Sequence, residues 1–553
     1  VVMERNNLSS AVLKLVKYNS APGCIYNYLR KDDEFYDVDK TIHELNTKYT
    51  KVPEVISRDF IENFENHVAL NAFGVLLSYL QFLKLDKNII DMDKASNYNE
   101  FMSSSSSNQK YMVLDGITLQ NLEIFANTFD GSDQGTFFKL INRATTGMGK
   151  RMIRKWVMLP LFQKPEIEDR LDSVDQLLDD FEIRELVENY LAKLSDLERL
   201  CARVHSNNLK FKEFNNKVLP GFENILEFIQ KIKKFELKGS MKEYVARIPE
   251  TLLDEKLKEW ANAYDRNNIL GDDQEYSIKL YPGVDKEYDQ SLNNINECAG
   301  KLSNELNSYK SLLKTTKLQF KDSGKELYTI EVPIEACKRV PGTWTQLGAN
   351  KSFKRYYSPE VASLAQEMAE YKEAHKILET NLTERLYLKF AENMNDVWTP
   401  TVELIASVDC LLSLCKTSES IGIPSCRPQF VDSDFSFLQF KSLRHPYFNM
   451  GSSSTTEFIP NDVELGLNET NKITLLTGAN AAGKSTVLRM TCIATIMAQI
   501  GCYVPCEYAK LTPIDRIMTR LGANDNIMQG KSTFLVELSE TKKILDLATD
   551  KSL

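Results

Sequence analysis

A glycine-rich stretch near the C-terminal end of the sequence has the residue types and spacing needed to hold phosphate. "LLTGANAAGKSTVLRM" spans residues 475–490 and contains the pattern G-x-x-x-x-G-K-[ST]. Its small residues let backbone amides point at phosphate oxygens, Lys484 would reach the β- and γ-phosphates, and Ser485 would ligate magnesium. The expected nucleotide-binding residues are Gly478, Ala479, Asn480, Ala481, Ala482, Gly483, Lys484 and Ser485.

The elements around this loop decide between a phosphate site and an ordinary glycine turn. "KITLL" precedes the loop and predicts a buried strand, because it is rich in β-branched residues and leucine. "STVLRMTCIATIMAQIG" follows the loop and predicts a helix that ends at Gly501. A strand, a loop and a helix in this order favour the phosphate site.

A nucleotide hydrolase also needs a carboxylate at the end of a second apolar strand, where it holds magnesium. No run of four apolar residues ending in Asp or Glu follows Ser485, and Asp515 and Asp546 lack a preceding strand. We therefore expect no complete catalytic set here, with the Walker B carboxylates absent. Because the sequence opens on Val1 and stops abruptly, we treat it as part of a longer protein.

Length and composition bound the remaining possibilities. The chain has 553 residues, of which 42% are hydrophobic, and a net charge of -9, so it has room for several domains with their own cores but no overall basic field. Its ten cysteines form no CxxC pair and it has only five histidines, which favours reduced intracellular thiols over a zinc site. No apolar run approaches the roughly 20 residues of a membrane helix, so we expect no membrane association.

The pattern along the chain predicts a mainly helical body with a projecting arm. A serine run at 103–107 indicates a linker or loop, and residues 111–285 have helical periodicity. A heptad seam predicts one long helix, and a second long helix is expected from about 359 to 390. Between them, "KLQFKDSGKELYTIEVP" predicts two strands joined by a turn at Gly324. The seam residues of the first helix are Tyr288, Leu292, Ile295, Ala299, Leu302, Leu306, Tyr309 and Leu313.

The expected tip of this arm is basic. Residues 311–357 contain nine basic and four acidic side chains, a local balance of +5, with aromatic residues interleaved in "KSFKRYY". Such a surface could lie on nucleic-acid phosphates, although a charge run is more often a solvated face.

Several longer stretches are similar to the MutS family of DNA mismatch-repair proteins. They include "GANAAGKST", "MAQIGCYVPCE", "LTPIDRIMTRLGANDNIMQGKSTFLVELSETKKIL", "LRHPYF", "FIPNDVEL", "MVLDGITLQNLEIF" and "TTGMGKRMIRKWVMLPL". These stretches are most similar in sequence to a fungal mismatch-recognition subunit of this family. The resemblance covers nearly the whole chain.

The resemblance implies a multidomain, mainly α protein: a helical lever with a long antiparallel arm and a small β-rich clamp tip, then a truncated α/β P-loop ATPase domain of the ABC type. The implied domains are the C-terminal part of a connector (1–110), the lever (111–285), the clamp (286–372), the returning lever helix (373–420) and the N-terminal part of the ATPase domain (421–553).

The resemblance also implies ATP and Mg²⁺ as cofactors and assigns further contacts. Phe458 and Ile459 would pack on adenine, with core packing as the alternative. Asn480 would add a side-chain contact to the phosphates, beside Thr486. His445 is a family mark for which a structural hydrogen bond is the simpler interpretation.

A second group of implied residues acts across a dimer. Ser532 and Thr533 resemble the signature that reaches the partner's nucleotide, while helix capping is the alternative for Ser532. Basic residues at the clamp tip would contact DNA backbone without reading sequence; these are Lys317, Lys321, Lys325, Lys351, Lys354 and Arg355.

The implied function is mismatch recognition within an ATP-regulated, heterodimeric sliding clamp in the nucleus. Its implied partners are the MutS homologue two subunit, double-stranded DNA with mismatches or small loops, and MutL-type repair proteins. The family's Phe-x-Glu mismatch wedge is not expected here, because the matches at 60–62 and 211–213 lie in the wrong segments. The alternatives are a meiotic MutS relative that binds branched DNA and an ABC-type or chromosome-maintenance ATPase, whose arms would be far longer.

Overall fold

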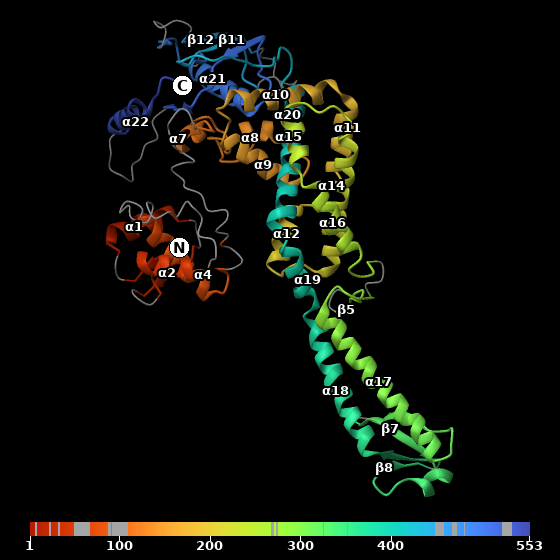
Figure 1. The fold of residues 1–553 in the computed structure, drawn as a ribbon. Coiled ribbons are helices and arrows are strands. Elements are labelled where there is room, and N and C mark those ends of the chain that lie inside the picture. Colours follow the sequence, from red (N-terminus) through yellow and green to blue (C-terminus); the bar gives the residue numbers. More distant parts are fainter. Residues whose placement is uncertain are drawn as a thin grey trace. The chain divides into compact units, whose positions relative to one another are not determined.

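The computed structural model resolves into two compact, mainly helical units (Figure 1). Unit 1 comprises Val1–Arg143, Ile153–Asp175 and Leu414–Leu553, and unit 2 comprises Ala144–Met152 and Gln176–Ser413. The structure describes residues 1–5, 8–20, 24–30, 34–48, 67–86, 90, 109–266, 270–272, 275–323, 326–350, 352–447, 458–466, 473–480, 482–521 and 533–553.

The described residues between 1 and 90 form a small α/β segment of unit 1. Two short strands pair in parallel, and two helices pack through Leu45, Phe73 and Leu77. The elements are β1 (Val2–Glu4), α1 (Ser10–Asn19), β2 (Asn27–Leu29), α2 (Val38–Lys48) and α4 (His67–Phe82).

The rest of unit 1 is built on a four-stranded sheet of order β10-β13-β11-β12, with β11 antiparallel to both of its neighbours. Its core joins Phe440 and Leu511 of the sheet to Met490 of α21 and Leu171 of α10. The elements are β3 (Val113–Leu114), α7 (Gly116–Asn121), α8 (Phe137–Ile141), β10 (Gln429–Phe430), β11 (Leu438–Leu443), β12 (Asn461–Leu465), α21 (Lys484–Ile500), β13 (Tyr508–Leu511), β14 (Arg516–Ile517) and α22 (Thr533–Leu547). Three helices contribute residues to both units: α9 (Gly147–Met158), α10 (Lys164–Asp179) and α20 (Thr399–Ser420).

Unit 2 has a helical body with an aromatic centre. Phe390 stacks on Trp398 with ring centroids 4.5 Å apart and meets Phe214 edge-on at 5.2 Å. Such pairs add directional packing to a large buried area. The elements are α11 (Phe181–Leu191), α12 (Leu197–His205), α13 (Phe211–Glu213), the π-helix η4 (Phe214–Val218), α14 (Leu219–Ile232), α15 (Gly239–Arg247), α16 (Glu250–Ala261), β4 (Leu270–Asp272), β5 (Glu275–Ser277), α19 (Leu382–Ala391) and the π-helix η6 (Met394–Trp398).

A long antiparallel helix pair in unit 2 ends in a four-stranded sheet (Figure 1). The helices α17 and α18 pack on each other, and Tyr309 and Leu313 continue this core into the sheet. This confirms the predicted arm with its β-rich tip. The elements are α17 (Lys286–Leu312), β6 (Gln319–Ser323), β7 (Glu326–Pro333), the 3₁₀ helix η5 (Ile334–Arg339), β8 (Thr345–Ala349), β9 (Phe353–Tyr357) and α18 (Pro359–Thr380); the sheet order is β6-β7-β9-β8.

The seam prediction needs two corrections. Ala299 is exposed and Cys298 is buried in its place, because a straight helix of 3.6 residues per turn drifts away from a strict seven-residue repeat. The second helix is not continuous to residue 390, since α18 ends at Thr380 and α19 starts at Leu382.

One helical stretch, Met394–Ser420, meets the length and hydropathy criteria for a membrane span, contrary to the expectation from the sequence. However, 72% of its apolar window is buried inside the protein. A mostly buried core helix meets the same criteria as a membrane span, so the stretch is weak evidence for a membrane.

Candidate nucleotide-binding site

The phosphate-binding loop leads directly into the N-terminus of α21. Gly483 precedes this 17-residue helix with φ +89°, a left-handed conformation that glycine adopts without strain. Lys484 is the first helical residue, and its Nζ lies 2.6 Å from the carbonyl oxygens of both Gly478 and Ala479. The loop therefore folds back over the ammonium group of its own lysine.

This arrangement fits a nucleotide phosphate chain with magnesium. The first amides of a helix lack partners within the helix, and together with the helix dipole they favour an anion. The Lys484 ammonium has three donors and gives two of them to the loop. Ser485 is exposed beside it on the first turn, where a metal held by the phosphates would meet its hydroxyl. Ala481 lies outside the described residues.

The strand expected before the loop is not formed. Residues 473–479 have no strand conformation, and Ile473 and Leu475 are 91% and 88% exposed. A strand exists only when its amides and carbonyls bond to a neighbour, and no described strand pairs with this segment. The prediction for "KITLL" was therefore wrong for this chain, whereas the helix ending at Gly501, which has φ +89°, is confirmed.

The other expected nucleotide contacts are placed only in part. Phe458 packs against the core of the sheet, while Ile459 is 80% exposed. Thr533 begins α22, as the predicted helix start required, but its side chain is not described and Ser532 lies outside the described residues. These four assignments remain predictions.

The two carboxylates considered for catalysis have other positions. Asp515 is buried and accepts hydrogen bonds from the hydroxyls of Thr549 and Ser552, so it ties the last residues of the chain to the start of β14. Asp546 is exposed on α22. Neither lies at the end of a strand, because β13 already ends at Leu511.

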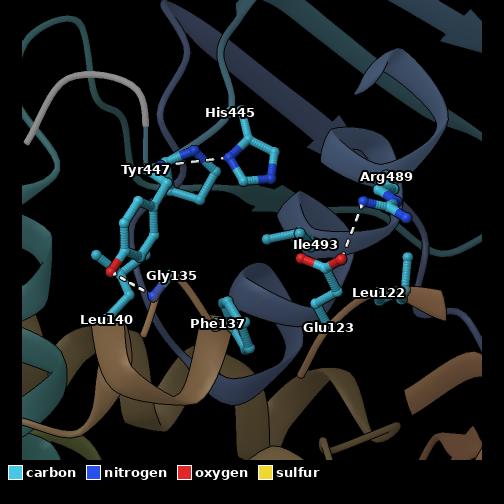
Figure 2. Close-up of a pocket in the computed structure, with 10 residues that line it drawn as sticks. Leu122, Glu123, Gly135, Phe137, Leu140, His445, Tyr447, Arg489 and Ile493 are labelled. Atoms are coloured by element: carbon cyan, nitrogen blue, oxygen red, sulfur yellow. Dashed lines mark hydrogen bonds and ion pairs between the residues drawn. The ribbon is translucent and has the colours of Figure 1, made fainter. Parts of the chain in front are cut away.

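A small cavity of about 30 Å³ lies beside α21 (Figure 2). Arg489 of α21 faces Glu123 across it, with Nη1 and Oε1 3.5 Å apart. The backbone amide of Gly135 donates to the Tyr447 hydroxyl at 2.9 Å, and the amide of Tyr447 donates to Nδ1 of His445 at 3.4 Å. His445 thus makes a structural hydrogen bond, which is the simpler of the two interpretations given for this residue from the sequence.

His445 is expected to make the stability of the protein depend on pH. Burial lowers its pKa from 6.5 to about 4, and the charge of Arg489 adds to this while Glu123 opposes it. Between pH 6.5 and 4 the imidazole of His445 is protonated in the unfolded chain but neutral in the folded protein. The free energy of unfolding therefore falls as pH falls through this window. The full loss is about 3 kcal/mol.

Urea unfolding of the protein and of His445→Gln between pH 4 and 7.5 measures this effect. The variant should show a flatter pH dependence, whereas exposed His205 replaced by Gln should leave it unchanged. Identical slopes for all three proteins would rule out His445 as the cause.

The tip sheet contains a buried carboxylate among its basic residues. Glu331 is 2% exposed; burial alone would raise its pKa, but hydrogen bonds from Gln319 and Arg355 and the charge of Lys321 outweigh burial and lower it. Arg355 Nε lies 3.2 Å from Glu331 Oε1, and Lys321 Nζ lies 3.8 Å from it. Lys317 is exposed and Lys354 half-buried, while Lys325 and Lys351 lie outside the described residues. Arg355 is therefore part of the sheet as well as a proposed DNA contact.

Comparison with known proteins places most of the chain in one family. The sequence profile of MutS domain III matches residues 117–415, and that of MutS domain V matches residues 474–553. The first of these alone covers more than half of the 553 residues. The chain belongs to the MutS family.

Individual MutS relatives agree with this. The chain is 54% identical to DNA mismatch repair protein MSH6 of Saccharomyces cerevisiae, over all of the chain and 44% of the relative. It is 31% identical to human Msh6, over all of the chain and 45% of the relative, and 27% identical to human Msh3, over 93% and 45%. The chain thus spans about half the length of these curated relatives, and its similarity to MSH6 exceeds its similarity to MSH3.

Two carboxylates of unit 2 explain the residue types in the stretch "TTGMGKR", because its side chains and backbone contact both of them. Asp409 of α20 is fully buried and accepts the amides of Thr145 and Thr146 at 2.9 and 2.8 Å and the Thr146 hydroxyl at 2.7 Å, at the start of α9. A Cβ at Gly149 would lie 2.1 Å from Asp409 Oδ2. Only glycine leaves room for this carboxylate.

The second carboxylate, Asp196, does the same at Gly147, two residues before Gly149. A Cβ at Gly147 would lie 2.5 Å from Asp196 Oδ2. Arg151 binds Asp196 with both Nη atoms, at 2.9 and 2.6 Å. These bonds and the hydrogen bond to Glu198 raise the Arg151 pKa against the opposing effect of burial. The two glycines and the arginine therefore recognise carboxylates brought from α12 and α20, which the pattern alone did not reveal.

Proposed function

We propose that this chain belongs to the mismatch-recognition subunit of a MutS-type heterodimer whose grip on DNA is regulated by ATP. The observation that carries the proposal is the 54% identity to yeast MSH6 along the entire chain, combined with a lysine-bearing loop at the N-terminus of α21. MutS proteins form a family of DNA-dependent ATPases, so the same chain should sense nucleotide and contact DNA.

In this proposal each residue of the loop has one task. The backbone amides from Gly478 to Lys484 hold the phosphates, and the Lys484 ammonium exchanges the carbonyls of Gly478 and Ala479 for β- and γ-phosphate oxygens. Ser485 and Thr486 lie at the metal side, and Asn480 adds a side-chain donor. When bound, Mg²⁺ neutralises phosphate charge.

The adenine and trans contacts complete the composite site. Phe458 and Ile459 flank the base, and Ser532 and Thr533 serve the nucleotide of the partner subunit, the MutS homologue two subunit. We expect ATP turnover to require that partner, because the signature residues act across the dimer. This chain alone should bind nucleotide weakly and not turn it over.

The proposed domains follow the expected boundaries. Residues 1–110 belong to a connector, 111–285 and 373–420 to a lever, 286–372 to a clamp, and 421–553 to an ATPase domain of the ABC type. The antiparallel pair α17 and α18 with its tip sheet supports the clamp assignment. Nucleotide-dependent changes in the lever would alter the hold of the clamp on mismatched DNA, and MutL-type proteins in the nucleus would read the result.

The DNA contacts of the clamp can be tested by charge reversal. Lys317→Glu with Lys354→Glu in the assembled heterodimer should weaken DNA binding about tenfold or more and lower the salt slope of log K by about 2, because each lost phosphate contact removes roughly one released counterion. The ion-pair partners of buried Glu331 are Lys321 and Arg355, and both stay in the double variant, so the tip should stay folded.

Lys242→Glu is the matched control, since this exposed lysine lies on α15 of the helical body. Fluorescence anisotropy at several salt concentrations measures both quantities. If the double variant kept the parent's affinity and slope, these lysines would not be DNA contacts.

A further inference from the structure

Two cysteine sulfur atoms from distant parts of unit 1 lie in contact. Cys426 Sγ and Cys506 Sγ are 3.5 Å apart, although the residues are separated by 80 positions. The backbone holds them there, because Cys426 and Val504 exchange both of their amide hydrogen bonds at 3.0 Å.

The surroundings of the pair differ on its two sides. Cys506 is fully buried within the sheet core, whereas Cys426 is only partly buried at its edge. A small oxidant from solvent therefore meets Cys426 first.

A buried guanidinium lies beside the pair. Arg444 donates its amide to the carbonyl of Pro505 at 3.0 Å, and its Nη2 donates to the carbonyls of Gly422 and Pro424 at 3.3 and 2.6 Å. Its Nε and Nη1 are buried without a hydrogen-bond partner among the described residues. Unsatisfied buried donors of a cation favour a nearby negative charge. The Arg444 charge acts on Cys506, where it favours the thiolate that the resolving cysteine must form.

We propose that Cys426 and Cys506 form an oxidation site, at which a hydroperoxide such as hydrogen peroxide converts the two thiols into a disulfide. Cys426 is the attacking sulfur and Cys506 the resolving one. The hydrogen bond from Cys506 lowers the pKa of the Cys426 thiol against the effect of burial, and the same hydrogen bond together with burial raises the pKa of Cys506.

The reaction balances in two steps. The Cys426 thiolate attacks one oxygen of hydrogen peroxide, so that an S–O bond forms, the O–O bond breaks and hydroxide leaves. Cys506 then loses its proton to this hydroxide, which becomes the first water, and attacks the Cys426 sulfur, so that the S–S bond forms and the S–O bond breaks. The hydroxide released from the Cys426 sulfur takes up the proton that the Cys426 thiol lost at the start and becomes the second water. Two thiols lose two electrons in total, and one peroxide becomes two water molecules.

The disulfide would join the turn after α20 to the segment between α21 and β13. The chain between the two cysteines includes the phosphate-binding loop and all of α21. Closing this loop should raise the melting temperature of the protein by several degrees, and dithiothreitol should reverse the change.

The test treats the purified chain with hydrogen peroxide, blocks the remaining thiols with N-ethylmaleimide and maps disulfides by mass spectrometry without reduction. We expect two of the ten thiols to disappear and a peptide linking Cys426 to Cys506 to appear. Cys426→Ser and Cys506→Ser should each abolish the linked peptide, and Cys506→Ser should leave a sulfenic acid on Cys426.

Cys201→Ser is the matched control, because this buried cysteine of α12 has its pKa raised to about 12 by burial and lies in unit 2. It should form the same disulfide as the parent. Oxidation confined to other cysteines, or a Cys426 sulfenic acid that persists while Cys506 of the parent chain stays reduced, would overturn the proposal.

Discussion

Lys484→Ala is expected to weaken binding of Mg–ATP about 100-fold, which corresponds to about 2.7 kcal/mol. The Lys484 ammonium donates hydrogen bonds to the carbonyls of Gly478 and Ala479 at the N-terminus of α21, where the phosphates would lie. Its two charge-assisted hydrogen bonds to phosphate oxygens would each contribute about 1.5–3 kcal/mol before the lost loop contacts are subtracted. Alanine keeps the helix but removes the charge.

The control for this variant is Lys441→Ala, an exposed lysine on β11 of the same unit. Titration of a fluorescent ATP analogue into the assembled heterodimer gives both affinities. Because the loop is exposed, Lys484→Ala should change the unfolding free energy by less than about 0.5 kcal/mol. Equal nucleotide affinity of Lys484→Ala and the parent would remove the loop from the proposed site.

Asp409→Ala is expected to destabilise unit 2 by about 3–5 kcal/mol. The substitution removes the acceptor of the amide and hydroxyl of buried Thr146 and of the Thr145 amide, and each buried group left unsatisfied costs about 1–3 kcal/mol. Asp409→Asn should cost less, because one amide oxygen still accepts. Urea unfolding followed by tryptophan fluorescence reports on this unit, which contains Trp260, Trp344 and Trp398.

Gly149→Ala provides the matching half of a double-mutant cycle. Alone it should also cost several kcal/mol, because the new Cβ would sit 2.1 Å from Asp409 Oδ2. In the Asp409→Ala background the clash disappears, so the two costs should not add and the coupling should exceed about 1 kcal/mol. If the two losses of unfolding free energy added, the Asp409 carboxylate would not be the reason why position 149 requires glycine.

The sequence predicted those parts of the fold whose cause is local. Periodicity located α17 and the two strands after it, and Gly501 located the end of α21. The heptad pattern wrongly placed Ala299 on the seam, because it assumes 3.5 residues per turn whereas a straight helix has 3.6. In the structure Cys298 is buried instead. The strand in "KITLL" could not be decided locally, since strand formation depends on a neighbour.

The candidate site divides in the same way. The pattern around Lys484 was sufficient to place the loop at a helix N-terminus, because glycines and a lysine at fixed spacing encode that geometry. Asp196 and Asp409 were missed because their partners lie 45 or more residues away. Asp409 still left one signal, a lone charge within the apolar run "LIASVDCLLSLC", which is unfavourable unless the fold satisfies it.

The most direct test of the proposed function compares DNA substrates with the full-length protein and its partner subunit. Fluorescence anisotropy on mismatched, matched and branched duplexes, with and without ATP, should show tighter binding to the mismatch and a change in that binding when ATP is added. Tightest binding to branched DNA would favour a meiotic MutS relative. Equal affinity for mismatched and matched duplex, unaffected by ATP, would contradict the account.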